Sequence, residues 1–216
     1  MLAILGRTGP EGKGLALRLA LAGEAVTIGS RSTERGAAAA AELAEGAPGA
    51  NIAGTDNAGA AAAGDVVFLA FPYEGQRPVL EELSASLDGK IVVSVIAPMV
   101  FERGKGARAV EVEAGSAAQE AQEILPNAQV VAAFQNVSAE ELQDPQVDME
   151  GDVVVCSDHA DAKKLVIGLA GKIKSLRGVD DWGALANAKY VEQITPLLVN
   201  INRIYRTHSG VKITGV

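Results

Sequence analysis

Short apolar runs alternate along the chain with longer segments in which apolar residues recur at helical spacing. The short runs predict buried strands at 2–5, 25–29, 65–70, 90–94 and 129–134, with 51–54 as a further short strand. The helical spacing predicts helices at 10–22, 33–45, 56–63, 74–86 and 116–124. Buried strands separated by helices indicate a parallel sheet that is covered on both faces. We therefore expect an α/β fold with a doubly wound, mostly parallel sheet of the Rossmann type.

Two parts of the chain depart from this regular alternation. Residues 97–115 contain glycines and no clean periodicity, so we interpret them as a long loop. After residue 150 a second strand–helix–strand unit is predicted at 152–156, 160–175 and 177–180, followed by a closing helix over 182–205 that Pro196 should kink or interrupt. We expect a large nucleotide-binding domain over 1–150 and a smaller C-terminal region over 151–216, whose first strands could extend the sheet.

Charge and composition then narrow the class of protein. The formal net charge is −8, the pI is near 4.9 and no basic stripe compensates, so we expect no nucleic-acid partner. Charged residues such as Arg18 and Glu24 interrupt the richest early apolar segment well short of a membrane-spanning length. The N-terminus lacks the basic start and cleavage site of a secretory signal. We expect no membrane partner and a cytoplasmic location.

The strongest local motif is Gly6-Arg7-Thr8-Gly9-Pro10-Glu11-Gly12, which follows the first strand and opens a helix. Glycines let the backbone turn tightly and approach a pyrophosphate, whose charge is met by free N–H groups and by the helix dipole. Pro10 suits the first turn of that helix. Arg7 stands where a GxGxxG motif would place its first glycine, so either Gly6 takes over the turn or Arg7 is tolerated and helps to neutralise phosphate. A tight turn without a ligand is the alternative.

The end of the second strand indicates which nucleotide binds. An NAD enzyme usually places Asp or Glu there, about twenty residues past the glycine turn, to bind a ribose hydroxyl. This chain has Gly29-Ser30-Arg31-Ser32-Thr33 instead. An arginine fork and serine hydroxyls favour a 2′-phosphate, so the segment predicts NADP(H). The alternative is that Arg31 is a solvated loop residue and Ser32 a helix N-cap.

Three further strand ends meet the same edge of the predicted sheet, where ligands of open α/β sheets bind. They carry Phe71-Pro72-Tyr73, Val95-Ile96-Ala97-Pro98 and Gln135-Asn136-Val137-Ser138. These residues could line the nicotinamide and its redox partner, whereas core packing or turn formation is the alternative.

Other catalytic constellations are missing from the sequence. The only histidines are His159 and His208, which we interpret as surface residues, and Cys156 lies in an apolar run and is expected to be a buried thiol. There is no Cys/His metal cluster and no serine–histidine pair, so we assign no catalytic side chain and no metal. Hydride transfer between two cofactors needs neither, because the cofactors carry the reactivity.

The sequence resembles the NADPH:F420 oxidoreductases, also called F420-dependent NADP reductases, over nearly its whole length. The resemblance is carried by Gly6–Arg18, Ile28–Arg31, Phe71–Tyr73, Ala133–Ala139 and Asn187–Leu198. It implies an enzyme that transfers a hydride reversibly between NADP(H) and the deazaflavin coenzyme F420.

The resemblance also implies roles for individual residues. Thr8, Ser30 and Arg31 would surround the adenosine 2′-phosphate, with Arg35 one helical turn later. The nicotinamide would lie beside Phe71-Pro72 and the loop after the strand at 90–94, against Val95, Ala97 and Pro98. The deazaflavin would lie near Gln135, Asn136 and Val137. The family usually has Gly where Arg7 stands and commonly His where Gln135 stands.

Two other functions remain as alternatives. One is an NADPH-dependent flavin or ferric reductase, because membrane ferric reductases carry a cytosolic domain similar to this family. The other is a non-catalytic NADP(H)-sensing module. A homodimer that covers the apolar face of the helix at 182–205 is also compatible with the sequence.

Overall fold

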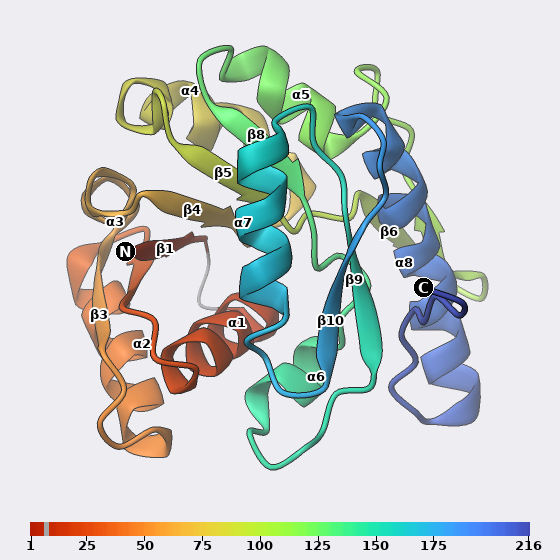
Figure 1. Cartoon of the computed structure of the whole chain (residues 1–216), viewed down its shortest axis with the longest axis horizontal. Helices are drawn as coiled ribbons and strands as arrows, with labels where there is room; N and C mark the ends of the chain where they lie inside the picture. Colours follow the sequence, from red (N-terminus) through yellow and green to blue (C-terminus); the bar gives the residue numbers. More distant parts are fainter. Residues whose placement is uncertain (7–8) are drawn as a thin grey trace.

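A six-stranded parallel sheet forms the centre of the molecule in the computed structural model, which describes residues 1–6 and 9–216 (Figure 1). The strand order is β3-β2-β1-β4-β5-β8, and all neighbours are parallel. The strands are β1 (Leu2–Leu5), β2 (Val26–Ser30), β3 (Ile52–Asp56), β4 (Val66–Leu69), β5 (Ile91–Ser94) and β8 (Gln129–Ala132). The predicted Rossmann-type arrangement is confirmed, and the order reverses between β1 and β4, where such sheets bind their ligands.

Helices cover both faces of this sheet, as the alternation in β1 requires. Leu2 and Ile4 pack in one core cluster and Ala3 and Leu5 in the other, because successive side chains of a strand point to opposite faces. The first face is covered by α1 (Pro10–Leu21), α2 (Thr33–Gly46) and α7 (Ala160–Ala170). The second face is covered by α3 (Asn57–Ala63), α4 (Gln76–Leu87), which follows the short helix η1 (Tyr73–Gly75), and α5 (Ala117–Ile124).

The expected loop at 97–115 is wrong in part, because it contains an antiparallel hairpin of β6 (Met99–Glu102) and β7 (Gly106–Ala109). The turn between the strands uses positive φ angles at Gly104 and Gly106. Asn200 of the closing helix donates to the carbonyl of Ala107 at 2.8 Å and accepts from its N–H at 2.8 Å. The hairpin is therefore fixed by a tertiary contact rather than by an apolar face of its own. A short helix, α6 (Ala139–Gln143), also went unpredicted.

The C-terminal strands form their own parallel pair, β9 (Gly151–Val155) with β10 (Leu176–Asp180). Their extension of the main sheet is limited to one antiparallel bridge, between Ala132 and Cys156. Helix α7 between them ends at Ala170, before the predicted residue 175. Buried residues of this region nevertheless pack in the same core cluster as β1 and α1. The boundary at residue 150 between a nucleotide-binding domain and a C-terminal region stays a prediction.

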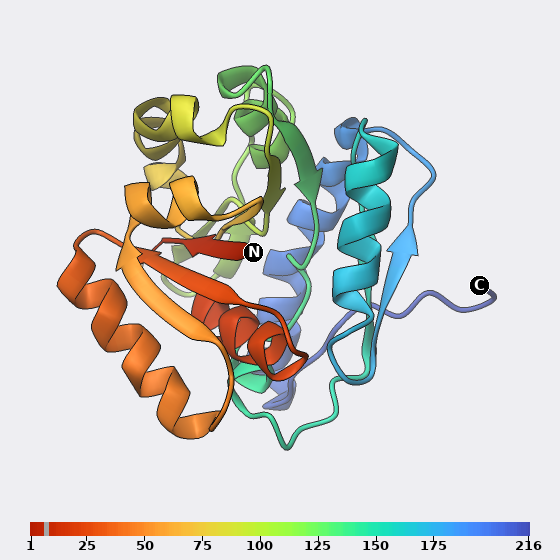
Figure 2. The same ribbon diagram turned by 60° about the vertical axis from the view of Figure 1, so that its left-hand side comes forward.

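The closing helix, α8 (Ala188–Tyr205), begins six residues later than the predicted start at 182. A loop and the short helix η2 (Leu185–Asn187) precede it, and Trp182 has a positive φ. Pro196 lies inside α8, which continues past it as one helix, so the predicted interruption is wrong. Figure 2 shows α7 and the β9–β10 pair beside the main sheet, with α8 behind them.

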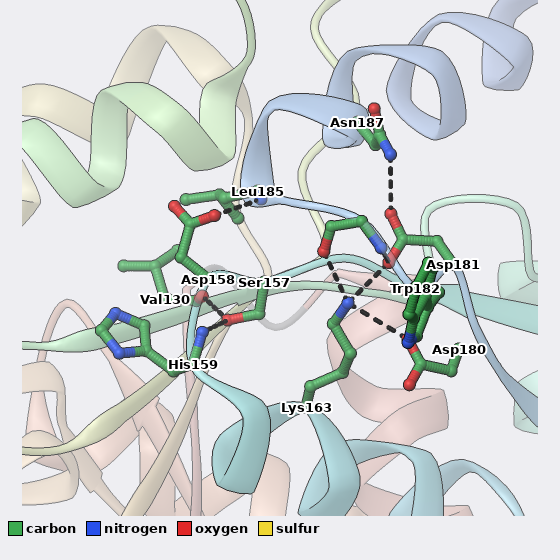
Figure 3. Close-up of polar contacts among 11 residues, drawn as sticks. Val130, Ser157, Asp158, His159, Lys163, Asp180, Asp181, Trp182, Leu185 and Asn187 are labelled. Atoms are coloured by element: carbon green, nitrogen blue, oxygen red, sulfur yellow. Dashed lines mark hydrogen bonds and ion pairs between the residues drawn. The ribbon is translucent and has the colours of Figure 1, made fainter.

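Buried polar contacts fix the start of α8 (Figure 3). Lys163 of α7 donates to Asp181 at 2.6 Å and to the carbonyl of Gly183 at 2.8 Å. Asn187 donates to the second oxygen of Asp181 at 3.0 Å. Further along α8, the buried carboxylate of Glu192 accepts the N–H groups of two residues in the first turn of α5, Ala117 and Ala118, at 2.8 and 3.1 Å. These contacts hold α8 against the carboxyl edge of the sheet.

Within residues 1–6 and 9–216, no helix combines the length and the apolar character needed to cross a membrane.

Candidate functional site

The turn after β1 depends on Gly6, whose φ of 139° lies in the region that favours glycine. A Cβ at Gly6 would collide with the carbonyl oxygen of Ala70, which follows β4. The N–H of Gly6 donates to the side chain of Asn57 at 3.3 Å. Gly6 therefore lets the chain pass close to β4 and return to the sheet edge. The predicted roles of Arg7 and Thr8 lie outside the described residues.

Helix α1 starts at this turn, and no side chain of the described residues caps its first N–H groups. Gly9 is the N-cap residue and makes no side-chain cap, and Pro10 occupies the first turn. Glu11 and Gly12 follow, so their N–H groups precede the first i to i−4 bond, from Lys13 to Gly9. Burial raises the pKa of the Glu11 carboxyl to about 8. A largely neutral carboxyl at neutral pH leaves the helix terminus suited to an anion.

At the end of β2, the residues expected at a 2′-phosphate divide into buried and exposed members. Ser30 is buried, whereas Arg31 and Arg35 are exposed at the start of α2. Ser32 caps α2 by accepting the N–H of Arg35 at 3.4 Å, as the alternative interpretation predicted. Capping by Ser32 leaves the Arg31 guanidinium, which forms no ion pair within the described residues, available to a ligand.

An acidic residue that the sequence reading did not consider lies beside this segment. Asp56 ends β3 and accepts the hydroxyl of Thr33 at 3.1 Å and the N–H of Gly59 at 2.7 Å. Both carboxylate oxygens therefore have protein donors. Asp56 serves α3 as its N-cap.

A cavity of about 390 Å³ lies between the glycine turn and the ends of β4, β5 and β8. It brings together nine predicted residues, namely Gly9, Pro10, Glu11, Gly12, Phe71, Pro72, Val95, Ala97 and Gln135. Met99 and Phe101 of the hairpin and Thr195 of α8 complete the wall on the other side. Pro98 does not line the cavity, and its carbonyl accepts the N–H of Val110 at the base of the hairpin at 3.0 Å.

A second cavity, of about 650 Å³, shares part of this wall. Both cavities are lined by Glu11, Met99, Phe101, Gln135 and Thr195. The second also contains the predicted Asn136 and Val137, and it extends along α8 to Arg203, Arg206 and His208. Phe101 is 72% exposed and belongs to both walls, so its ring is available to a ligand. Two ligands in these cavities would meet at the shared wall.

A strained backbone turn orients Gln135 into the shared wall. Phe134 has a φ of 72°, which is rare for an aromatic residue. Its ring is buried and packs against Phe68 with centroids 6.0 Å apart, which holds the turn in place. The next residue, Gln135, is 4% exposed and donates from Nε2 to the carbonyl of Ser94 at 2.9 Å. The amide oxygen is thereby left on the side away from Ser94.

Contacts between the end of β8 and α8 close the site. Asn136 donates from Nδ2 to the carbonyl of Val191 at 2.8 Å and to the hydroxyl of Thr195 at 3.0 Å. Thr195 in turn donates to the carbonyl of Gln135 at 3.0 Å. The polar segment after β8 thus fixes a helix that lies some 50 residues away in sequence.

Sequence reasoning missed the residues that the hairpin and α8 contribute. The hairpin had a usable signal, because Met99-Val100-Phe101 precedes a glycine-containing turn. His208 is exposed, as interpreted, and it also lines the second cavity. Its Nδ1 lies 3.3 Å from the hydroxyl of Ser138, so the expectation that no serine has a histidine partner is wrong for Ser138. The buried thiol expected at Cys156 is confirmed, and burial raises its pKa to about 12.

Comparison with known proteins identifies the family of this chain. The family model described as NADP oxidoreductase, coenzyme F420-dependent, matches residues 1–98. The whole chain is 40% identical over 221 residues to an F420-dependent NADP reductase of Methanocaldococcus jannaschii, of which the match covers 98%. This chain belongs to the F420-dependent NADP reductase family.

A solved structure and a metalloreductase are also similar to this chain. A crystal structure of a protein assigned as an F420-dependent NADP reductase, from Arthrobacter sp. FB24, superposes with a TM-score of 0.83 at 26% identity and covers 99% of this chain and 98% of the other. Metalloreductase STEAP3 of Rattus norvegicus is 31% identical over 191 residues, which cover 88% of this chain and 35% of that protein. The resemblance to the F420-dependent family thus extends over the full chain, including α8.

The raised pKa of Glu11 gives a testable pH dependence. We expect NADPH affinity to fall about tenfold, equivalent to about 1.4 kcal/mol, as the pH rises above about 8, because the carboxyl then ionises beside the cofactor phosphates. Titration of binding between pH 6.5 and 9.5 measures this. Glu11→Gln should remove the dependence, whereas Glu74→Gln, which removes another carboxyl from the same cavity, should keep it. An unchanged profile in Glu11→Gln would contradict the assignment.

Proposed function

We propose that this chain catalyses reversible hydride transfer between NADP(H) and the deazaflavin coenzyme F420. The observation that carries the proposal is the shared wall of the two cavities, at the carboxyl edge of the sheet and next to the glycine turn. Such a wall lets two planar rings approach each other, which is the main requirement of transfer between two cofactors.

The chain's contribution to NADP(H) is binding and orientation. The first N–H groups of α1, which no described side chain caps, would receive the pyrophosphate, and Gly6 keeps the backbone close enough for that contact. Ser30, Arg31 and Arg35 would bind the 2′-phosphate. Phe71, Pro72 and the segment after β5 would hold the nicotinamide in the first cavity.

On the acceptor side, the chain positions the deazaflavin and excludes water. Gln135, Asn136 and Val137 line the second cavity, and the hairpin residue Phe101 would cover the ring. The two rings supply the reactive atoms, nicotinamide C4 and deazaflavin C5, and a solvent proton balances the reaction. Burial of Gln135 and the contacts of Thr195 hold the shared wall rigid, which favours a fixed approach geometry.

An acceptor panel tests the proposal. Oxidation of NADPH, followed by absorbance, should be fast with coenzyme F420 and at least about a hundredfold slower with FMN or a ferric chelate. Ferric reduction is the second candidate, favoured by the likeness to STEAP3. A preference for ferric chelate would support that candidate instead. NADPH binding without turnover on any acceptor would identify a sensing module.

Gln135 gives a second prediction. Its side chain already donates to Ser94, and its amide oxygen can accept a bond at the shared wall, so it can replace a neutral histidine that only positions the ring. Gln135→His should therefore change the rate with F420 by less than about tenfold, equivalent to 1.4 kcal/mol. A gain of several orders of magnitude would show that a proton donor is required there, and would favour the other acceptors. Single-turnover kinetics measures the effect.

We further propose that α8 pairs two copies of the chain. Tyr190, Leu197 and Ile204 are 63%, 55% and 73% exposed, and with the half-buried Ile194 and Ile201 they follow the alternating four- and three-residue spacing of a helix-pairing seam. Leu197→Glu should convert a dimer to a monomer in analytical ultracentrifugation, while Leu165→Glu on α7 should not. A wild-type monomer at micromolar concentration would contradict the pairing. Cytoplasmic location and the absence of a nucleic-acid partner stay predictions.

A further inference from the structure

The second cavity continues past the shared wall to the C-terminal end of α8, where its lining becomes cationic. Arg203, Arg206 and His208 line this end. Within the described part of the chain, neither arginine forms an ion pair. The chain as a whole carries a formal net charge of −8. Two arginines without carboxylate partners in an acidic protein indicate a local site for an anion.

The backbone around Arg206 is held by specific hydrogen bonds. Arg206 ends α8 in the left-handed conformation, with φ 51° and ψ 51°, and its N–H bonds to the carbonyl of Asn202. The Asn202 side chain accepts the N–H and the hydroxyl of Ser209, each at 2.6 Å. The hydroxyl of Ser138, which also lines the cavity, lies 3.3 Å from His208 Nδ1. The turn after α8 is thus a built wall, and Arg206 is fixed at its backbone.

Two carboxylates also line this cavity, and only one of them lies near the α8 end. Glu11 belongs to both cavities and so lies toward the glycine turn. Glu140 lies 3.6 Å from His208 Nε2, so two arginines stand against one carboxylate at this end. The cationic end and the shared wall therefore lie at different parts of one cavity.

We propose that Arg203 and Arg206 bind the anionic tail of coenzyme F420, the phosphate and glutamate carboxylates that follow its deazaflavin ring. The inference rests on the proposed function, because it uses F420 as the occupant of the second cavity. With the ring at the shared wall, the tail runs along α8 toward the two guanidinium groups. Arginine forks bind phosphate and carboxylate oxygens in pairs, so the two residues set affinity for the tail and leave ring chemistry unchanged.

The test compares full-length F420 with the tail-less deazaflavin riboside as acceptors. In the double variant Arg203→Gln/Arg206→Gln, KM for F420 should rise at least about tenfold with kcat unchanged, and KM for the riboside should stay the same. Glutamine removes the charge but keeps an unbranched polar side chain, so the cost of the left-handed backbone at position 206 stays similar. Lys164→Gln/Lys172→Gln removes the same charge near the opposite sheet edge, where both lysines lie beside Met1 and Asp65, and should change neither KM.

The outcomes separate the subsite from the proposed function. A KM that rises for both acceptors, or for neither, overturns the subsite while leaving hydride transfer to F420 standing. Wild-type enzyme that turns over neither acceptor overturns both proposals. Raising the salt concentration should increase the wild-type KM for F420 and leave that for the riboside unchanged. Loss of folding in the double variant would be detected by its circular dichroism, and the salt series with wild-type enzyme then decides the question.

Discussion

Replacing Arg31 by alanine should weaken NADPH binding by about ten- to a hundredfold and leave NADH binding nearly unchanged. A charged hydrogen bond to the 2′-phosphate contributes roughly 1.5–3 kcal/mol, and only NADPH carries that phosphate. Arg31 is exposed at the end of β2, and Ser32 beside it is engaged in capping α2, so the arginine is the principal charged donor in the segment. Fluorescence titration of both nucleotides measures the difference.

The control is Arg103→Ala, which removes an exposed arginine from the β6–β7 turn and should alter neither affinity. Equal losses for NADPH and NADH in Arg31→Ala would show that the residue supports the fold or the pyrophosphate rather than the 2′-phosphate. NADP(H) preference would then need another origin, and Ser30 and Arg35 would be the next residues to test.

The second large expectation is that the hydride passes directly between the two cofactors. Residues common to both cavities, among them Gln135, Thr195 and Phe101, form the shared wall at which the two rings would meet. The one cysteine is buried with its pKa raised to about 12, so it is not a thiolate at neutral pH. Direct transfer retains the identity of the migrating hydrogen, whereas any path through an exchangeable protein group loses it.

Much of the fold could be predicted from local pattern. Strands β1, β2 and β4 at the centre of the sheet are fully buried, and apolar runs such as Val66–Leu69 identify them without further information. Element ends were less predictable, since the end of α7 at Ala170 depends on the turn that leads into β10. The β6–β7 hairpin has a local signal in Met99-Val100-Phe101 and the glycine turn, but its contact with Asn200 spans 93 residues and could not be predicted.

The site, too, has parts that local sequence predicts and parts that only the tertiary fold brings together. The glycine turn and the strand ends were predictable, because topology brings the carboxyl ends of parallel strands to one edge. The α8 side of the site was not, because only the fold places Thr195 beside Gln135 and carries Arg203 and Arg206 to the second cavity. The positive φ of Phe134 had no sequence signal, since an aromatic residue rarely adopts it.

The most direct test of hydride transfer uses NADPH deuterated at C4 on the transferred face. After reaction of wild-type enzyme with F420 in ordinary water, mass spectrometry of the reduced deazaflavin should find essentially one deuterium per molecule, at C5. Each C4-deuterated face should be tested separately, and only one should deliver its label. Deuterium in the solvent and none in the reduced coenzyme, whichever C4 face carries the label, would contradict direct hydride transfer.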